Sequence, residues 1–160
     1  TLLQKGQLPF VEAARLLPDV RFVLAGKWLD DSVDRLRAIA PPNVELAGWV
    51  SDAELHDLYR RASAYVQVSR HEGFGLAVAE AMLAGCVPVV RDVTAMPEVV
   101  GEAGVFAASQ SPEDVAAAIA AALDRGPDAH LAARARIRDT FPLSIRREGL
   151  LDVVGETVDR

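Results

Sequence analysis

Two glutamates near the middle of the chain, Glu72 and Glu80, have the types and spacing that most suggest chemistry. Seven residues separate them, and these include the glycine-framed segment Gly73-Phe74-Gly75. A pair of carboxylates can serve as acid and nucleophile in glycoside hydrolysis, or can accept hydrogen bonds from the hydroxyls of a ligand. The glycosidase alternative is disfavoured, because glycines at the start of a helix favour a bound phosphate.

Glu80 lies in a segment, residues 75–84, that we predict to be a buried helix. Every other residue from Leu76 to Ala84 is apolar, so no face of this helix is polar. A carboxylate in such a helix needs a partner, because an unpaired buried charge is costly. Three interpretations are open: an ion pair with an Arg or Lys in the core, a place on a narrow exposed strip, or hydrogen bonds from a ligand entering at the helix start. The adjacent glycines favour the third.

The glycines stand where a predicted strand, residues 64–68, gives way to this helix. Ligands of open α/β sheets bind at the carboxyl ends of the strands, and the N–H groups of a first helical turn attract anions. Glu72 would then lie in a loop over the crevice, and Glu80 one to two turns inside the helix. A nucleotide sugar, with phosphates between two hydroxyl-rich ends, would satisfy all these features.

Strands and helices are predicted to alternate along the rest of the chain. The predicted strands are short, apolar and unalternating, which is typical of a parallel sheet covered on both faces. Ser51 and Ser111 each begin a helix with acidic residues in the first turn. We therefore predict a Rossmann-like α/β fold, with strands at about 21–25, 44–47, 64–68, 87–90 and 105–107, and helices at about 8–17, 30–39, 51–61, 75–84, 111–123, 128–140 and 143–158.

Length and composition indicate one soluble domain of 160 residues with a net charge of 17 − 23 = −6 and no basic block. Nucleic acid and anionic membranes are therefore poor candidate partners. The single cysteine, Cys86, excludes an intrachain disulfide and is interpreted as a small core residue. The histidines are scattered, so no metal site is expected. The chain lacks a starting Met, and we expect it to be a fragment of a longer cytoplasmic protein.

The segment Glu72, Gly73-Phe74-Gly75 and Glu80 resembles the paired-glutamate motif of retaining GT-B glycosyltransferases, chiefly family 4 of the group 1 type. Residues 80–90 resemble the glutamate helix and next strand of that family, and residues 97–106 resemble its downstream loop. The resemblance covers nearly all of residues 4–125 and fades beyond. It implies that residues 1–160 are a single C-terminal, donor-binding domain whose N-terminal acceptor domain is absent from this chain.

The resemblance also implies roles for single residues. Glu72 would hold sugar hydroxyls, Glu80 would accept hydrogen bonds from the ribose diol, and the backbone of Phe74, Gly75 and Leu76, with Gly73 beside it, would contact the diphosphate or the sugar. Lys5, before Gly6, resembles the phosphate-binding lysine of the family. An ammonium there would stabilise the negative charge of the departing nucleoside diphosphate. Lys5 and Glu72 are thus the expected catalytic residues.

Other positions have weaker assignments. Gly26 and Val50, with Lys27 and Gly48 beside them, follow two strands and resemble the base and ribose site, although turn chemistry alone explains the glycines equally well. Arg70 and Arg91 follow strands and would add positive potential near phosphates, whereas His71 is interpreted as an exposed loop residue and the role of Glu98 is left open.

The sequence departs from the family at two places. Val68 stands where the family commonly has Pro, and Thr94-Ala95 stands where it often has a pair of glycines.

The implied function is transfer of a sugar from a nucleoside-diphosphate sugar to a glycan, glycolipid or small molecule, with retention of configuration and without metal or cofactor. The acceptor, and any membrane, would be contacted through the absent domain, so the isolated chain should bind donor weakly and catalyse little.

Two other functions are alternatives: an epimerase or phosphorylase on the same architecture, and a non-catalytic nucleotide-sugar-binding module. A dinucleotide-binding domain is disfavoured, because no Gly-x-Gly-x-x-Gly follows the first strand. Base, sugar and acceptor are left open.

Overall fold

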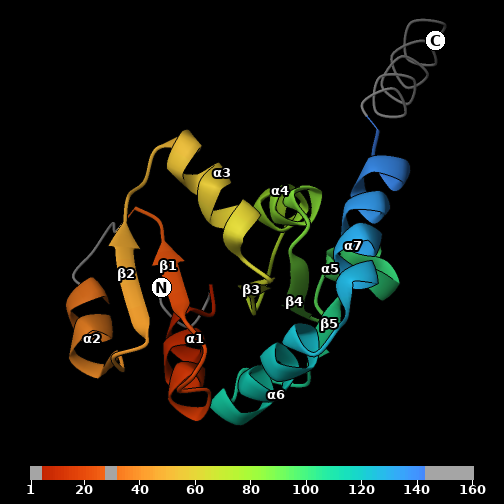
Figure 1. The fold of residues 1–160 in the computed structure, drawn as a ribbon. Coiled ribbons are helices and arrows are strands. Elements are labelled where there is room, and N and C mark those ends of the chain that lie inside the picture. Colours follow the sequence, from red (N-terminus) through yellow and green to blue (C-terminus); the bar gives the residue numbers. More distant parts are fainter. Residues whose placement is uncertain (1–4, 28–31, 143–160) are drawn as a thin grey trace, which may run out of the picture.

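A computed structural model describes residues 5–27 and 32–142, in which short strands and helices alternate (Figure 1). The predicted helix at 143–158 and the first two residues of the predicted helix at 30–39 lie outside the described residues. None of the described helices is long and apolar enough to cross a membrane. The elements in chain order are α1 (Gln7–Ala13), the 3-10 helix η1 (Ala14–Leu16), β1 (Phe22–Ala25), α2 (Ser32–Ile39), β2 (Val44–Gly48), α3 (Asp52–Arg61), β3 (Ala64–Gln67), α4 (Leu76–Ala84), β4 (Val87–Arg91), α5 (Met96–Val100), the 3-10 helix η2 (Gly101–Ala103), β5 (Val105–Ala107), α6 (Pro112–Leu123) and α7 (Pro127–Thr140).

The described strands pair in parallel, as predicted, but in two separate ladders. β1 pairs with β2, and β4 lies between β3 and β5. The residues of β4 alternate between the two faces: Val89 packs in a cluster with α6, and Val90 packs in a cluster with α4, α5 and α7. Helices therefore cover both faces of the three-stranded ladder, which confirms the predicted Rossmann-like arrangement.

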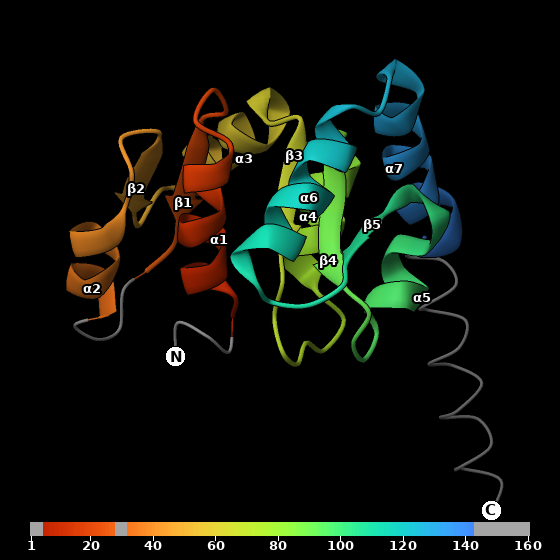
Figure 2. The same cartoon turned by 90° about the horizontal axis from the view of Figure 1, so that it is seen from below.

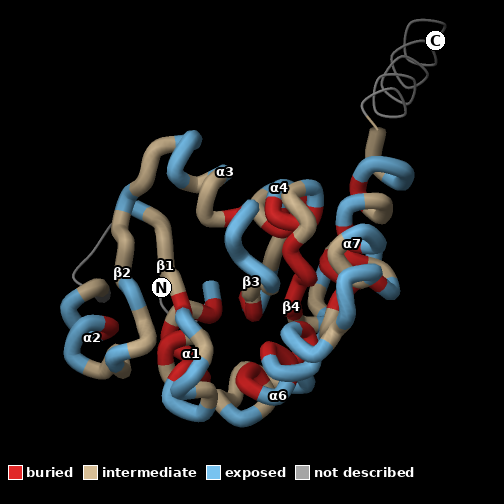
Figure 3. Tube along the Cα trace, in the orientation of Figure 1, coloured by how far each residue is buried: buried red, intermediate tan, exposed pale blue. Residues whose placement is uncertain are grey.

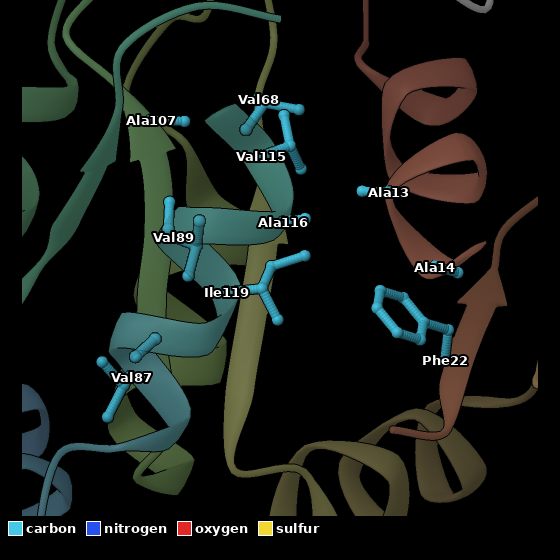
Figure 4. Packing of buried hydrophobic residues seen from close by; sticks show 12 residues of the cluster. Ala13, Ala14, Phe22, Val68, Val87, Val89, Ala107, Val115, Ala116 and Ile119 are labelled. Atoms are coloured by element: carbon cyan, nitrogen blue, oxygen red, sulfur yellow. The ribbon is translucent and has the colours of Figure 1, made fainter. Parts of the chain in front are cut away.

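Side chains join the two ladders. Phe22 of β1 and Ala13 and Ala14 beside it share one core cluster with Val115 and Ile119 of α6 and with residues around β3 and β4 (Figure 4). Helix α6 thus lies against α1 on one side and the three-stranded ladder on the other, with its inner face buried (Figures 2 and 3). The burial of apolar surface, rather than a continuous row of backbone hydrogen bonds, holds the two ladders together.

Helix α4 differs from the prediction in one respect. Val78, Ala79, Ala81 and Met82 are buried, but the side chains of Leu76, Glu80 and Leu83 are exposed, with 69% of Leu76 accessible. Residues spaced by three and four positions lie on one face of a helix, so these three form a strip. The prediction of burial on every face is therefore wrong for this strip. Glu80 lies on this exposed strip, as the second interpretation has it, and no Arg or Lys pairs with it among the described residues. The third interpretation, hydrogen bonds from a ligand, stays a prediction.

Both predicted helix caps are confirmed. The Oγ of Ser51 accepts a hydrogen bond from the backbone N–H of Glu54 at 3.4 Å, and the Glu54 carboxylate accepts one from the backbone N–H of Ser51 at 2.8 Å. These hydrogen bonds from Ser51 lower the pKa of Glu54. At α6, the Oγ of Ser111 accepts from the backbone N–H of Asp114 at 3.1 Å. Each cap satisfies a donor that the first turn leaves without a partner.

The substitution Ser51→Ala should lower the free energy of unfolding by about 1 kcal/mol, because it removes the cap of α3. Urea unfolding followed by circular dichroism measures this loss. Ser63→Ala is the matched control, since Ser63 is exposed, precedes β3 and caps no helix. A loss at Ser63 as large as the loss at Ser51 would contradict the role of the cap.

Cys86 is the small core residue that its sequence context predicts. It is fully buried, and its thiol donates a hydrogen bond to the carbonyl of Tyr59 at 3.1 Å. Burial raises the pKa of the Cys86 thiol to about 11, because desolvation disfavours the thiolate. The reactive form of the thiol is therefore scarce at neutral pH.

Alkylation of Cys86 by iodoacetamide at pH 8 should consequently be slower in the folded chain than in the guanidinium-unfolded chain by at least about two orders of magnitude, from the difference in thiolate fraction alone. Mass spectrometry of the time course provides the rate. Because the folded pKa is the raised one, the folded rate should rise steadily as the pH increases from 8 to 10. Comparable rates in the two states would show that the thiol is accessible and ionised.

Candidate functional site

The start of α1 lies directly against the end of β3, and only glycine permits this approach. A Cβ atom on Gly6 would lie 2.7 Å from Cγ2 of Val68 and 2.8 Å from its carbonyl oxygen, and Gly6 has a φ of 76°. Both the space and the backbone conformation therefore exclude a larger residue. This contact brings Lys5, at the start of the described chain, to the loop between β3 and α4.

Lys5 and Glu72, the two expected catalytic residues, meet in this loop. The Nζ of Lys5 donates a hydrogen bond to Oε2 of Glu72 at 3.1 Å, although 67 positions separate them in the sequence. The same oxygen accepts hydrogen bonds from Nε2 of Gln67 and, at 3.3 Å, from Oγ of Ser69. The Glu72 side chain is only 14% exposed, whereas that of Lys5 is 57% exposed. The ammonium of Lys5 thus has N–H groups left for a further partner.

Sequence reasoning missed Gln67 and Ser69. Gln67 is the one polar side chain of the strand 64–68, and this isolated polarity was the available signal. The hydroxyl of Tyr65 donates to Oε1 of Gln67 at 3.0 Å. Burial, followed by the charges of Tyr59, Glu72 and others, raises the pKa of Tyr65, so its hydroxyl stays protonated and remains a donor. This bond turns the amide group of Gln67 so that its NH₂ faces Glu72.

The loop after β4 holds the backbone of Glu72. The Oγ1 of Thr94 accepts a hydrogen bond from the N–H of Glu72 at 3.3 Å and donates one to its carbonyl oxygen. Figure 2 shows the two loops side by side beyond β3 and β4. Thr94 has a φ of 49°, a conformation that glycine adopts more easily, at the position where the family often has glycine. The two bonds to Glu72 offset the cost of this conformation, which is about 1–2 kcal/mol.

The first turn of α4 is open to a ligand. Gly75 precedes it with a φ of 77°, and no side chain caps the helix. A Cβ on Gly75 would lie 2.5 Å from Cε of Met96, the flexible end of that side chain, so it is the positive φ that requires glycine here. The N–H groups of the first turn, which begins at Leu76, have no partner within their own helix. These N–H groups follow the Glu72 loop in the chain, and they can bind an anion at the start of α4.

The remaining residues of the motif are exposed beside this turn. A Cβ on Gly73 would meet no atom within 4 Å, so packing does not require glycine at that position. Phe74 is 41% exposed and packs edge-on against Phe141, with ring centroids 5.2 Å apart. Glu80 lies one turn beyond Leu76 on the exposed strip of α4.

Gly26 and Val50 follow β1 and β2, the strands of the other ladder. The N–H of Gly26 donates to the carbonyl of Gly48 at 2.7 Å, which joins the carboxyl ends of β1 and β2. Within the described ranges, no hydrogen bond or ion pair joins Gly26 or Val50 to Lys5 or Glu72. Trp49 lies between Gly48 and Val50 with 72% of its surface exposed, and sequence reasoning missed it. Its signal was a large aromatic residue directly after a strand-ending glycine.

Of the other charged residues near these ends, Arg91 is the most unusual. It ends β4, and its Nε is buried without a hydrogen-bond partner in the described part of the chain. By contrast, Nε of Arg70 donates to Gln110 at 2.9 Å. His71 is exposed, as predicted, and the exposed Glu98 lies in the first turn of α5 without capping it. Arg91 therefore places a guanidinium with an unpaired Nε at the end of the central strand.

Residues 5–27 and 32–142 contain no group of three His, Cys, Asp or Glu side chains that could hold a metal ion. The positive charge at the carboxyl ends of β3 and β4 comes instead from Lys5, Arg70 and Arg91, together with the start of α4. This arrangement can bind an anionic group and, through Glu72, hydroxyl groups next to it.

Known proteins share both the sequence and the fold. Escherichia coli O-antigen chain mannosyltransferase B is 39% identical over 118 residues, which are 71% of this chain and 29% of that protein. The GDP-mannose:cellobiosyl-diphosphopolyprenol alpha-mannosyltransferase of Xanthomonas oryzae pv. oryzae (strain PXO99A) is 36% identical over 92 residues, which are 54% of this chain and 24% of that protein. The chain thus spans less than a third of the length of either relative.

Solved structures support the same fold. Anabaena Alr3699/HepE, in complex with UDP and glucose, has a TM-score of 0.83 at 22% identity, covering 96% of this chain and 45% of that one. A glycosyltransferase from Rickettsia africae ESF-5 has a TM-score of 0.84 at 17% identity, covering 97% and 45%. Residues 2–125 match the family described as Glycosyl transferases group 1. Since this match extends over most of the chain, the protein belongs to the group 1 glycosyl transferases, with a GT-B-type fold.

Proposed function

We propose that this chain is the donor-binding domain of a retaining, metal-independent mannosyltransferase that uses GDP-mannose. The observation that carries the proposal is the contact between Lys5 and Glu72 beside the uncapped start of α4. The choice of mannose rests on the relatives, since several proteins that are 33–39% identical to this chain are named mannosyltransferases. The choice of guanine rests on the relative from Xanthomonas oryzae, whose name includes GDP-mannose.

The diphosphate would lie at the start of α4. There it meets the N–H groups of the first turn and the ammonium of Lys5, and Arg91 adds positive charge from the end of β4. These charges stabilise the negative charge that grows on the leaving phosphate oxygen as the bond to the sugar breaks. They supply the stabilisation that a metal ion supplies in other enzymes, which is why we propose a metal-independent reaction.

Glu72 would position the sugar. Its Oε2 already accepts three hydrogen bonds, whereas Oε1 has none within the described residues. Oε1 is therefore free to accept a hydrogen bond from a sugar hydroxyl. The three donors to Oε2 hold the carboxylate in one orientation, as the positioning of a sugar hydroxyl requires. We thus assign Glu72 to positioning of the donor rather than to covalent catalysis.

The proposed reaction exchanges one bond at the sugar C1. The bond from C1 to the diphosphate oxygen breaks and its electron pair goes to that oxygen, while an acceptor hydroxyl bonds to C1 from the same face and transfers its proton to the departing phosphate. Because attack occurs on the face from which the leaving group departs, the configuration is retained. The acceptor, a glycan or lipid-linked glycan, would be bound by parts of the protein beyond this chain, and we place the reaction in the cytoplasm.

Isothermal titration of the chain with GDP, UDP and ADP tests the donor. GDP should bind most tightly, and Glu80→Gln should weaken its binding by about tenfold, because a neutral amide replaces a charged acceptor of the ribose hydroxyls. Glu113→Gln is the matched control, an equally exposed glutamate on α6. Equal affinities for the three nucleotides would reject GDP, and an unchanged affinity in Glu80→Gln would reject the ribose contact.

Transfer of mannose by the full-length protein tests the catalytic assignment. Lys5→Gln should lower kcat by about a hundredfold or more, because it removes a charge that stabilises the leaving group, and Lys5→Arg should restore part of the rate. Activity should persist in EDTA. Two results would contradict the proposal: loss of activity in EDTA that Mg²⁺ reverses, or an unchanged kcat in Lys5→Gln.

A further inference from the structure

A pocket lies at the opposite end of the strands from the candidate donor site. It has a volume of about 330 Å³ and is formed by the last turns of α3 and α4, the chain before β3, and the early part of α7. Helices α3 and α7 both pack against α4 (Figure 1). The pocket residues at 60–63 directly precede β3 and those at 84–85 directly precede β4, whereas Glu72 and Thr94 follow these strands. Strands of four and five residues separate the two sites by about 13–17 Å.

The lining of this pocket is strongly basic. Arg60, Arg61 and Arg134 all contribute to it, together with His130, and no carboxylate lines it. Asp57 is the acidic partner that reaches these arginines: its carboxylate lies 3.5 Å from Arg60 and 2.9 Å from Arg61. Three arginines and this aspartate leave a local charge of 3 − 1 = +2, in a chain with a net charge of −6. A positive pocket on a negative domain attracts small anions.

Two of the basic side chains, Arg134 and His130, are held in place by the end of α4, and Arg134 still has N–H groups to offer. Arg134 donates from Nε to the carbonyl of Leu83 at 2.8 Å and from Nη2 to that of Ala84 at 3.2 Å. His130 donates from Nδ1 to the carbonyl of Gly85 at 2.8 Å. Because a guanidinium carries five N–H donors, Arg134 retains three after these contacts. Fixed donors lose little entropy when they bind a ligand.

Capping of α4 explains the positions of Arg134 and His130. Their bonds to the last carbonyls of α4 satisfy acceptors that a helix end leaves without partners. This role does not require Arg60 and Arg61 of α3 to line the same pocket. Guanidinium groups that converge from different directions match a tetrahedral oxyanion better than a planar carboxylate, which one arginine can hold.

We propose that this pocket binds a phosphate group, as a second ligand site separate from the donor crevice. The proposal does not depend on the sugar or nucleotide used in the crevice. The phosphate can belong to a soluble phosphorylated molecule or to a lipid headgroup, since both present the same oxyanion to the arginines. The two sources are separated by experiment.

Nuclear magnetic resonance of the 160-residue chain with inorganic phosphate, in the presence of saturating GDP, tests the pocket itself. Backbone amide signals of Ser63 and Gly85 report on the pocket, and those of Gly73 and Gly75 report on the donor crevice. We expect saturable shifts at Ser63 and Gly85 in the native chain. In the double variant Arg60→Ala, Arg61→Ala, the phosphate affinity at these signals should fall by about tenfold or more.

Arg37→Ala is the matched control, because Arg37 is also an exposed helical arginine paired with an aspartate three positions earlier. It should leave the phosphate titration unchanged. An equal loss in Arg37→Ala would show a general effect of net charge and would overturn the proposal. An absence of shifts at Ser63 and Gly85 in the native chain would show that free phosphate does not bind.

Vesicle flotation identifies the source of the phosphate. Retention of the native chain on phosphatidylglycerol vesicles, but not on phosphatidylcholine vesicles, with loss in the Arg60 and Arg61 double variant, would assign the pocket to a lipid headgroup. Binding of free phosphate without retention on vesicles would assign it to a soluble ligand. If neither free phosphate nor phosphatidylglycerol binds, the proposal is overturned.

Discussion

The contact of Gly6 with Val68 is the constraint on which the candidate site depends. Because Gly6 has no side chain, the start of α1 lies directly against Val68, the residue that follows β3. This contact places Lys5 beside Glu72. The carbonyl of Val68 also accepts a hydrogen bond from Nε2 of Gln110, at 2.6 Å. Val68 is therefore held from two sides, by α1 and by the loop before α6. The family often has proline here, but a valine held in this way fixes the exit of the strand as well.

The candidate site holds Glu72 in a fixed position and leaves neighbouring groups exposed. Glu72 is fixed through its backbone by Thr94 and through one carboxylate oxygen by three donors, so its free oxygen has a defined position. Lys5, which bonds to Glu72, is exposed, and so are Leu76 and Glu80 on the helix that follows. A ligand therefore meets groups that need little rearrangement, and little conformational entropy is lost when it binds. The burial of the surrounding core maintains this geometry.

Local sequence signals predicted most of the elements. The Ser51 and Ser111 caps, the strand and helix order and the buried Cys86 all follow from side-chain chemistry within a few residues. The exposed strip on α4 could not be predicted, because its composition is as apolar as the buried faces, and only tertiary packing decides which face is covered. The bonds from Gln67 and Thr94 to Glu72 depend on how loops meet in space, and sequence spacing does not record this.

The two ladders of the described strands meet through packed side chains instead of shared backbone hydrogen bonds. Hydrogen-bonded strands keep a nearly fixed spacing, whereas packed side chains permit small sliding movements. Gly26 and Val50 lie on one side of this junction between the ladders, and Glu72 and the start of α4 lie on the other. The proposed nucleotide site would lie across this junction, so its width would be set by side-chain packing. Packing of this kind is what a shear movement between the two ladders would require.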